Sequence, residues 1–174
     1  MQPKETRTII PEEDGKTHIN IYSKGKTHLG RMLSNFYKFP INTKDGPFMS
    51  VEGYWYWLGL SETEPRREEF RKLYGYTAKK TAQEILKTTP VEERRVDDNF
   101  EEKILLAIWY KFRRNAHLIT EDLKHLPMEH YYNYGGKVVD CSNRYPWMIE
   151  GIAKMRDILV ERMETNNEGN SSKN

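Results

Sequence analysis

The strongest helical pattern in the chain is NFEEKILLAIWYKFRR, residues 99–114. Its apolar side chains recur at the spacing of one helix face and form a continuous stripe: Ile104, Leu105, Ile108, Trp109 and Phe112. Asn99 and Glu102 have the spacing of a capping box at the amino end of this helix. We therefore expect the helix to lie at the centre of the hydrophobic core.

Helical periods recur on both sides of this segment, at residues 51–58, 66–74, 77–87 and 148–163. Ser50 directly precedes the first of them and is expected to be its N-cap. The extended segments are short. Residues 18–22 alternate polar and apolar side chains, a second extended segment is expected to end at Pro40-Ile41, and Gly135-Gly136 leads into a predicted strand at 137–141.

These elements predict an α+β fold, a mostly helical single domain with a few short strands. The domain is expected to cover residues 17–163. Both ends are polar and poor in apolar residues, so we expect a flexible arm at 1–16 and a disordered tail at 164–174.

Composition limits the classes of function. The chain has 28 Lys and Arg against 26 Asp and Glu, so no strong overall charge attracts it to nucleic acid or to an anionic membrane, and any phosphate recognition has to be local. Cys141 is the single cysteine, which excludes an internal disulfide. Residues 1–30 contain no apolar segment typical of a signal sequence or membrane span, so a cytoplasmic protein is expected.

Two motifs in the first third of the chain occur together in a known family. They are Leu-Ser-Asn-Phe-Tyr at residues 33–37 and Ser-Val-Glu-Gly-Tyr-Trp-Tyr at 50–56, with Asp45-Gly46 and Phe48 between them. In order and spacing they resemble the NADAR, or YbiA-like, family. Weaker matches continue in register through residues 98–103, 111–118 and 151–156, so the resemblance spans about residues 19–160.

The resemblance implies a mostly helical α+β domain that cleaves N-glycosidic bonds between a phosphorylated ribose and a nitrogen base. Members of the family act on ribosylaminopyrimidine intermediates of riboflavin synthesis, or remove ADP-ribose from modified guanine in nucleic acid. The motifs leave both branches open. The expected partners are a ribosyl or ADP-ribosyl small molecule and, in the second branch, ADP-ribosylated nucleic acid; neither a cofactor nor a membrane is implied.

The sequence departs from the family pattern in two places. Asn99-Phe100 stands where the family usually has Asp-Trp, so an aromatic ring is kept but the indole N–H donor is not. After the strand at 137–141 the family has an acidic residue and a Trp-Gly-x-Gly segment, whereas this chain enters its last helix directly. Asp140 is the nearest carboxylate there. These departures support an alternative function, a module that binds ADP-ribose or a nucleotide without cleaving it.

Glu52 is the expected catalytic carboxylate, with Asp140 assisting. Cleavage of a ribose–nitrogen bond passes through an oxocarbenium-like state. A fixed carboxylate can stabilise the positive charge of this state or deprotonate the attacking water. Glu52 lies in the first turn of its helix, where the helix dipole favours the ionised form. The alternative is that Glu52 only complements the helix dipole, a common role for acidic residues in a first turn.

The expected substrate-binding residues divide by chemistry. Ser34 and Asn35 offer hydrogen-bond donors and acceptors, although they could equally shape a turn. Aromatic contacts with the substrate are expected from Phe36, Tyr56 and Phe100, with core packing as the alternative.

Phosphate groups would need Lys or Arg side chains. The resemblance places Arg31 and Lys103 near the expected pocket, so they are favoured over the other cations near the motifs, which are Lys79, Lys80, Arg94 and Arg95. The five His residues have no metal-ligand spacing, and Cys141 is interpreted as a buried structural thiol. A third hypothesis places the aromatic residues 54–57 on the surface, where they would contact a partner protein.

Overall fold

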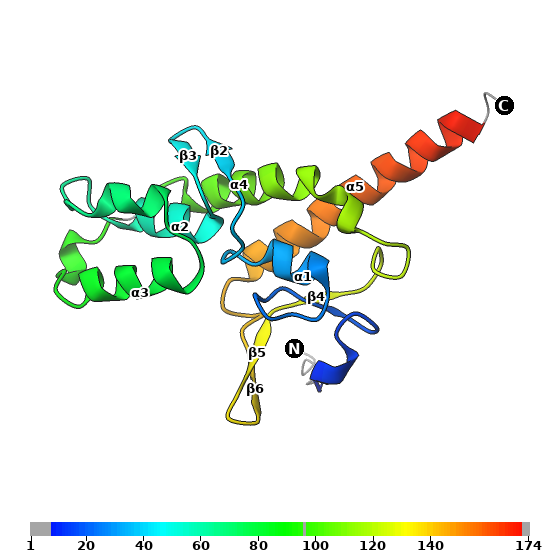
Figure 1. Cartoon of the computed structure of the whole chain (residues 1–174), viewed down its shortest axis with the longest axis horizontal. Helices are drawn as coiled ribbons and strands as arrows, with labels where there is room; N and C mark the ends of the chain where they lie inside the picture. Colours follow the sequence, from blue (N-terminus) through cyan, green and yellow to red (C-terminus); the bar gives the residue numbers. More distant parts are fainter. Residues whose placement is uncertain (1–7, 96, 172–174) are drawn as a thin grey trace, which may run out of the picture.

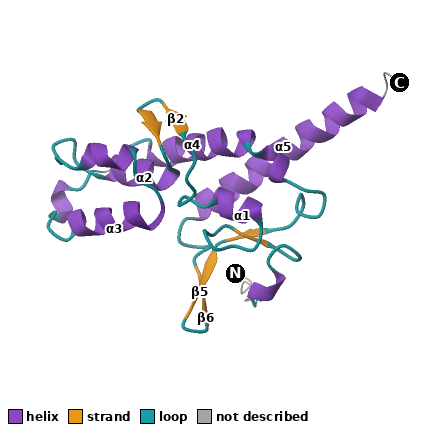
Figure 2. Ribbon diagram, viewed as in Figure 1, coloured by secondary structure: helices purple, strands orange, loops and turns teal. Residues whose placement is uncertain are grey.

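A computed structural model describes residues 8–95 and 97–171 (Figures 1 and 2). Its α-helices are α1 (His28–Leu33), α2 (Val51–Gly59), α3 (Gly75–Leu86), α4 (Phe100–Arg114) and α5 (Pro146–Ser171). Its strands are β1 (Ile19–Asn20), β2 (Ile41–Thr43), β3 (Gly46–Phe48), β4 (Met128–Glu129), β5 (Tyr131–Tyr134) and β6 (Lys137–Asp140). Short 3-10 helices are η1 (Pro11–Glu13), η2 (Arg67–Arg71), η3 (Val91–Glu93) and η4 (Ala116–Leu118). The predicted α+β class with a few short strands is confirmed.

Helix α4 lies at the centre of the core, as its apolar stripe predicts. It contacts α1, α2, α5 and β2 (Figure 1). Ile104, Ile108 and Phe112 are fully buried on this helix. The predicted capping box is wrong, because Asn99 does not have the extended backbone of an N-cap and its side chain makes no capping bond. Asp97 Oδ1 instead accepts a hydrogen bond from the Asn99 N–H at 3.0 Å.

The start of α2 is fixed by its predicted cap. Ser50 Oγ accepts a hydrogen bond from the Gly53 N–H at 2.9 Å and donates one to the Leu73 carbonyl at 2.9 Å. Residues 66–74, for which a helix is predicted, form only the short η2, and the Leu73 carbonyl bonds to Ser50 instead of continuing a helix. A Cβ atom on Gly53 would overlap the Phe70 carbonyl oxygen, so this glycine permits the close packing of η2 on α2.

Each strand pairs with one other strand. β1 and β4 are parallel, with Ile19 opposite Met128. β2 and β3 form an antiparallel hairpin at the predicted Asp45-Gly46 turn, so the extended segment begins at Ile41 where the sequence predicts its end. The predicted strand at 137–141 is confirmed as β6, which pairs with β5 in a second hairpin turning at Gly135 and Gly136, both with positive φ.

The structure describes part of each end of the chain. Within the predicted arm, Asp14 is buried and accepts hydrogen bonds from the Asn20 and Lys26 N–H groups. Within the predicted tail, α5 continues to Ser171 and projects from the rest of the chain, with residues 164–169 exposed (Figure 1). Residues 1–7 and 172–174 lie outside the described ranges.

The aromatic residues of α2 are packed inside the protein, which contradicts the hypothesis of an exposed contact patch. Tyr54 and Trp57 are buried, and Trp55 packs in an aromatic cluster with Phe100 and Trp147. The Trp55 ring thus fills space between α2, α4 and α5, whereas Tyr54 and Trp57 pack on Phe48 of β3. None of the described helices is long and apolar enough to cross a membrane.

Candidate functional site

A cavity of about 330 Å³ lies where the segment after α1, the first turns of α2, helix α3 and the segments flanking the β5–β6 hairpin meet. Five of the predicted site residues line it: Ser34, Asn35, Phe36, Glu52 and Tyr56. The two sequence motifs that carry the family resemblance therefore converge on one cavity. The first motif forms the loop after α1 and the second forms the start of α2, and these two elements face each other.

Three hydrogen bonds fix the Leu33–Tyr37 segment, one to α4, one to α2 and one within the segment. The fully buried Lys111 of α4 donates from Nζ to the Ser34 carbonyl at 2.9 Å. The Glu52 N–H donates to the Asn35 carbonyl at 3.0 Å, and the Phe36 N–H donates to Ser34 Oγ at 3.3 Å. The backbone carbonyls of Ser34 and Asn35 are thus used for structure, while the side chains of Asn35 and Phe36 line the cavity.

Asn35 presents an unused acceptor at the cavity. Its amide nitrogen donates weakly to Met148 Sδ at 3.7 Å. Its amide oxygen is buried and has no hydrogen-bond partner among the described residues. An unpaired buried acceptor costs about 1–3 kcal/mol, so such groups are rare in folded proteins. The Asn35 oxygen is therefore suited to accept a hydrogen bond from a ligand in the cavity.

Glu52 is 8% exposed, and its protonation differs from the sequence-based expectation. Burial raises the pKa of Glu52 to about 7, although the Tyr56 hydroxyl bonded to it and the positive charge of Lys79 act in the opposite direction. Removal from water thus outweighs the helix dipole, which was expected to keep Glu52 ionised. At neutral pH the carboxyl group is able both to give and to take a proton, as general acid–base catalysis requires.

Residues from the second half of the chain complete the cavity. They are His130, Tyr132, Cys141, Arg144, Tyr145 and Met148. The parallel pairing of β1 with β4 carries this region next to the first motif, although the two are far apart along the chain. Periodicity has no signal for such a pairing, so sequence reasoning did not single out His130 or Arg144. Cys141 is buried, as expected, and burial raises the pKa of its thiol.

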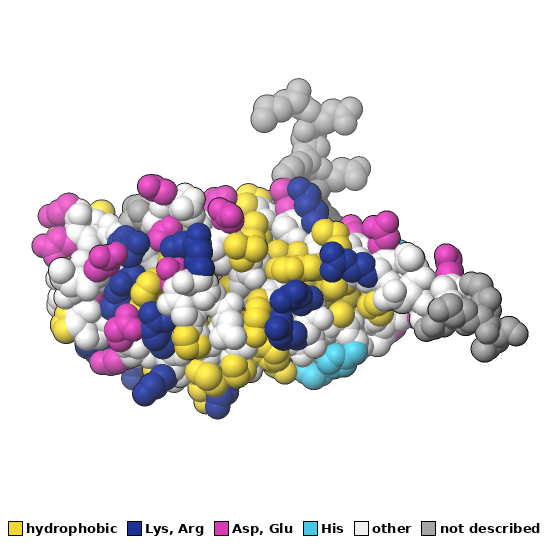
Figure 3. Space-filling view, turned by 90° about the horizontal axis from the view of Figure 1, so that it is seen from above, with side chains coloured by type: hydrophobic (Ala, Val, Ile, Leu, Met, Phe, Trp, Pro, Cys, Tyr) yellow, Lys and Arg dark blue, Asp and Glu magenta, His cyan; other side chains and the backbone are white. Residues whose placement is uncertain are grey.

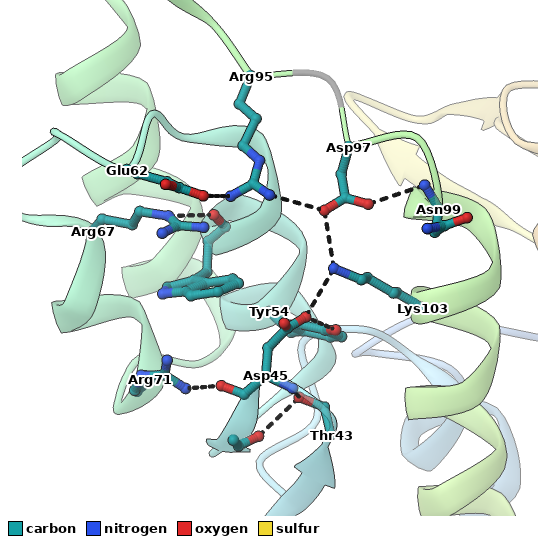
Figure 4. A network of polar contacts seen from close by, with 12 residues as sticks. Thr43, Asp45, Tyr54, Glu62, Arg67, Arg71, Arg95, Asp97, Asn99 and Lys103 are labelled. Carbon is teal, nitrogen blue, oxygen red and sulfur yellow. Dashed lines mark hydrogen bonds and ion pairs between the residues drawn. The ribbon is translucent and has the colours of Figure 1, made fainter.

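The two cations favoured from the sequence do not line the cavity. The Arg31 guanidinium donates to the Gly25 and Lys26 carbonyls, both at 2.8 Å, and so closes the turn before α1. Lys103 is paired with Asp45 at 3.1 Å and with Asp97 at 3.0 Å (Figure 4). Each side chain is already used by partners that its local fold supplies.

The network around Lys103 has a structural role. Asp45 also accepts a hydrogen bond from the Tyr54 hydroxyl at 2.6 Å, and Asp97 also pairs with Arg95 (Figure 4). The Lys103 network links the β2–β3 turn, helix α2 and the segment before α4. The cations that do line the candidate cavity are Lys79 of α3 and Arg144 before α5, which are both exposed.

Asp140 and Phe100 also lie outside the cavity lining. Asp140 is exposed at the end of β6, and its Oδ1 accepts a hydrogen bond from the Ser142 N–H at 2.9 Å. Phe100 packs edge-on against Trp55, with ring centroids 4.7 Å apart, and the indole of Trp55 stands in the lining. A catalytic role for Asp140 and substrate stacking on Phe100 are therefore not supported by where these residues lie.

Outside this cavity, the residues that the structure describes form a smaller hollow but no cluster of metal-ligand side chains. A second hollow of about 280 Å³ lies between the β2–β3 hairpin and α4, and includes Tyr110 and Arg113. Figure 3 shows the face of the molecule that carries this region, where Lys and Arg side chains lie among apolar ones. Within residues 8–95 and 97–171, no group of three His, Cys, Asp or Glu side chains is placed to hold a metal ion.

Comparison with known proteins identifies a fold. No protein-family model matches the chain, and no curated protein matches its sequence. The NMR structure of the E. coli protein YbiA is similar, with a TM-score of 0.56 and 20% sequence identity over 86% of this chain and 89% of that one. A match at this identity concerns the fold alone. The chain thus has a YbiA-like fold, as its motifs predicted.

Proposed function

We propose that this protein hydrolyses the N-glycosidic bond between a phosphoribosyl or ADP-ribosyl group and a nitrogen base. The observation that carries the proposal is that Glu52, which lines the cavity, is a buried carboxyl group with a pKa of about 7. Asn35, whose amide oxygen is unpaired, lines the same cavity. Buried acids with such a pKa are typical of acid–base catalysts.

The chemistry follows from the protonation of Glu52. The protonated carboxyl group donates its proton to the leaving nitrogen while the bond from C1′ to that nitrogen breaks. The carboxylate that remains stabilises the positive charge that develops on the ribose. Water then forms the new bond to C1′ and gives up one proton. Tyr56, whose hydroxyl interacts with the Glu52 carboxyl group, orients it during both steps.

The rest of the cavity suits a ribosyl phosphate with a base. Its volume of about 330 Å³ lies at the small end of the range typical of ligand sites. Phe36 and Trp55 offer aromatic surface for the base or ribose, and the Asn35 oxygen can accept from a ribose hydroxyl or a base N–H. Lys79 and Arg144 can neutralise phosphate groups.

Turnover assays test the proposal. The wild-type protein and Glu52→Gln are incubated with ADP-ribosylated guanine nucleic acid and with ribosylaminopyrimidine phosphates, and released base is measured by chromatography. Turnover of one substrate by the wild type and a loss of about 10²–10⁴-fold in Glu52→Gln are expected. Glu161→Gln, an exposed change on α5, is the matched control and should keep wild-type activity. Equal turnover by wild type and Glu52→Gln contradicts the role of Glu52.

Binding without cleavage is the second candidate function. It is favoured by one observation, that Glu52 is the one carboxylate in the described cavity lining, since Asp140 lies outside it. Calorimetric binding of ADP-ribose that is weakened in Asn35→Leu, together with no release of base from either substrate, would establish the binding module. Turnover would exclude it.

A further inference from the structure

His130 is a titratable group of the cavity to which the function above assigns no role. It lies between β4 and β5, so it reaches the cavity from a different part of the fold than Glu52 of α2. Both residues line the same cavity. The water that attacks C1′ has to lose a proton. A second proton acceptor at this site would let water lose its proton while Glu52 is still giving its own to the leaving base.

The hydrogen bonds of His130 define its tautomer. Nδ1 lies 2.7 Å from the Ile21 carbonyl oxygen, which can only accept a hydrogen bond, so Nδ1 carries the proton. In the neutral ring Nε2 is then an acceptor with a free lone pair. Nε2 makes no hydrogen bond to any described residue. The protein thus leaves the acceptor of the ring unused, on a residue that lines the cavity.

The backbone around His130 holds the ring in place. Its N–H donates to Ser142 Oγ at 3.0 Å, and its carbonyl accepts from the Cys141 N–H at 2.7 Å. Together with the Nδ1 bond to Ile21, these contacts tie His130 to two neighbouring segments. A base whose position is fixed before substrate binds needs no rearrangement during the reaction.

The electrostatic surroundings keep His130 uncharged at neutral pH. Burial lowers its pKa, and the positive charge of Arg144 acts in the same direction. The bond to the Ile21 carbonyl and the negative charge of Asp140 oppose this without reversing it. A neutral imidazole is the form that accepts a proton.

We propose that His130 is the general base of this hydrolysis, an inference that rests on the function proposed above. Nε2 takes one proton from water as the water oxygen bonds to C1′, the bond from C1′ to nitrogen breaks, and protonated Glu52 gives one proton to the leaving base. Exchange with solvent then reprotonates Glu52 and deprotonates His130. One water is consumed, and no other reactant is needed. The arrangement also explains how the site works although Asp140 lies outside it.

The decisive variant is His130→Asn. Its amide nitrogen replaces Nδ1 and keeps the bond to the Ile21 carbonyl, but nothing replaces Nε2. If His130 is the base, kcat falls about 10²–10⁴-fold, KM changes less than about threefold, and the acidic limb of the pH profile of kcat/KM disappears. A purely structural role of the ring predicts near-wild-type kcat and an unchanged pH profile, and that result overturns the proposal.

Two further measurements keep the outcomes separate. Nitrogen NMR of wild-type His130 at pH 7 should show a proton on Nδ1 and none on Nε2, and a resonance of Nε2 that moves when ADP-ribose is added. A proton on Nε2 overturns the proposal even if His130→Asn fails to fold. Turnover that requires Glu52 but survives in His130→Asn refutes the role of His130 alone. Absence of turnover in the wild type refutes the proposed function and the role of His130 together.

Discussion

Replacing Glu52 by Gln should change how stability depends on pH. Gln has nearly the same shape as Glu, so it preserves packing but carries no ionisable proton. In the unfolded chain Glu52 has a pKa of 4.5, and in the folded protein burial raises the pKa to about 7. The substitution therefore removes the free energy that is needed to ionise a buried carboxyl group.

The sign and size follow from proton linkage. Below pH 4.5 Glu52 is protonated in both states and does not affect the pH dependence. Between pH 4.5 and about 7 the folded state keeps a proton that the unfolded state has lost, so the wild type loses stability as pH rises. Above pH 7 the loss is complete. At about 1.4 kcal/mol per tenfold in the ionisation constant, it amounts to roughly 3 kcal/mol.

Urea unfolding at about pH 4 and about pH 8.5 measures this effect. The free energy of unfolding of Glu52→Gln minus that of the wild type should increase by roughly 3 kcal/mol between the two pH values. Glu161→Gln is the control, because its exposed side chain meets solvent in both states and should give no comparable increase. An increase below about 1 kcal/mol, or a decrease, would contradict the raised pKa of Glu52 in the folded protein.

Substitutions at Lys111, Gly53 and Asn35 test the core, the packing of α2 and the cavity. Lys111→Met removes a buried amine, and burial lowers the pKa of that amine from 10.5 to about 7. In urea unfolding, the free energy of unfolding of the wild type should therefore rise by several kcal/mol relative to this variant between pH 7 and pH 10.5. No rise would contradict the burial of the charge. Gly53→Ala should lower the free energy of unfolding by at least about 2 kcal/mol, because the added Cβ overlaps η2. Gly59→Ala is the control, and should be neutral or slightly stabilising because the space around Gly59 is free. Equal effects of the two substitutions would contradict the close packing at Gly53. Asn35→Leu should leave the free energy of unfolding within about 1 kcal/mol of the wild type. It should weaken the binding of ADP-ribose, measured by calorimetry, at least about tenfold. Unchanged binding would show that the amide oxygen does not face the ligand.

Local features of the fold could be predicted from the sequence because their causes are local. The apolar stripe of α4 is a property of consecutive residues, and so is the cap that Ser50 provides to α2. The residues of the two motifs, among them Asn35 and Glu52, line one cavity because they belong to a loop and a helix start that are joined by a backbone hydrogen bond.

The misplaced residues depend on contacts between distant segments. Nothing near Lys103 in the sequence indicates that Asp45 is its partner, and only the fold of the β2–β3 turn against α4 brings them together (Figure 4). The ionisation of Glu52 was misjudged for the same reason. The helix dipole is visible in the sequence, but desolvation depends on every segment that covers the side chain, and here it is the larger effect. His130 enters the cavity only through the pairing of β1 with β4.

The central claim is that the cavity beside Glu52 binds a ribosyl nucleotide. A crystal structure of the protein with ADP-ribose tests it most directly. The expected complex has the anomeric carbon of the terminal ribose beside the Glu52 carboxyl group, a hydrogen bond to the Asn35 amide oxygen, and phosphates directed to Lys79 and Arg144. ADP-ribose bound instead in the hollow beside Tyr110 and Arg113, or absent from the cavity at saturating concentration, would contradict the claim.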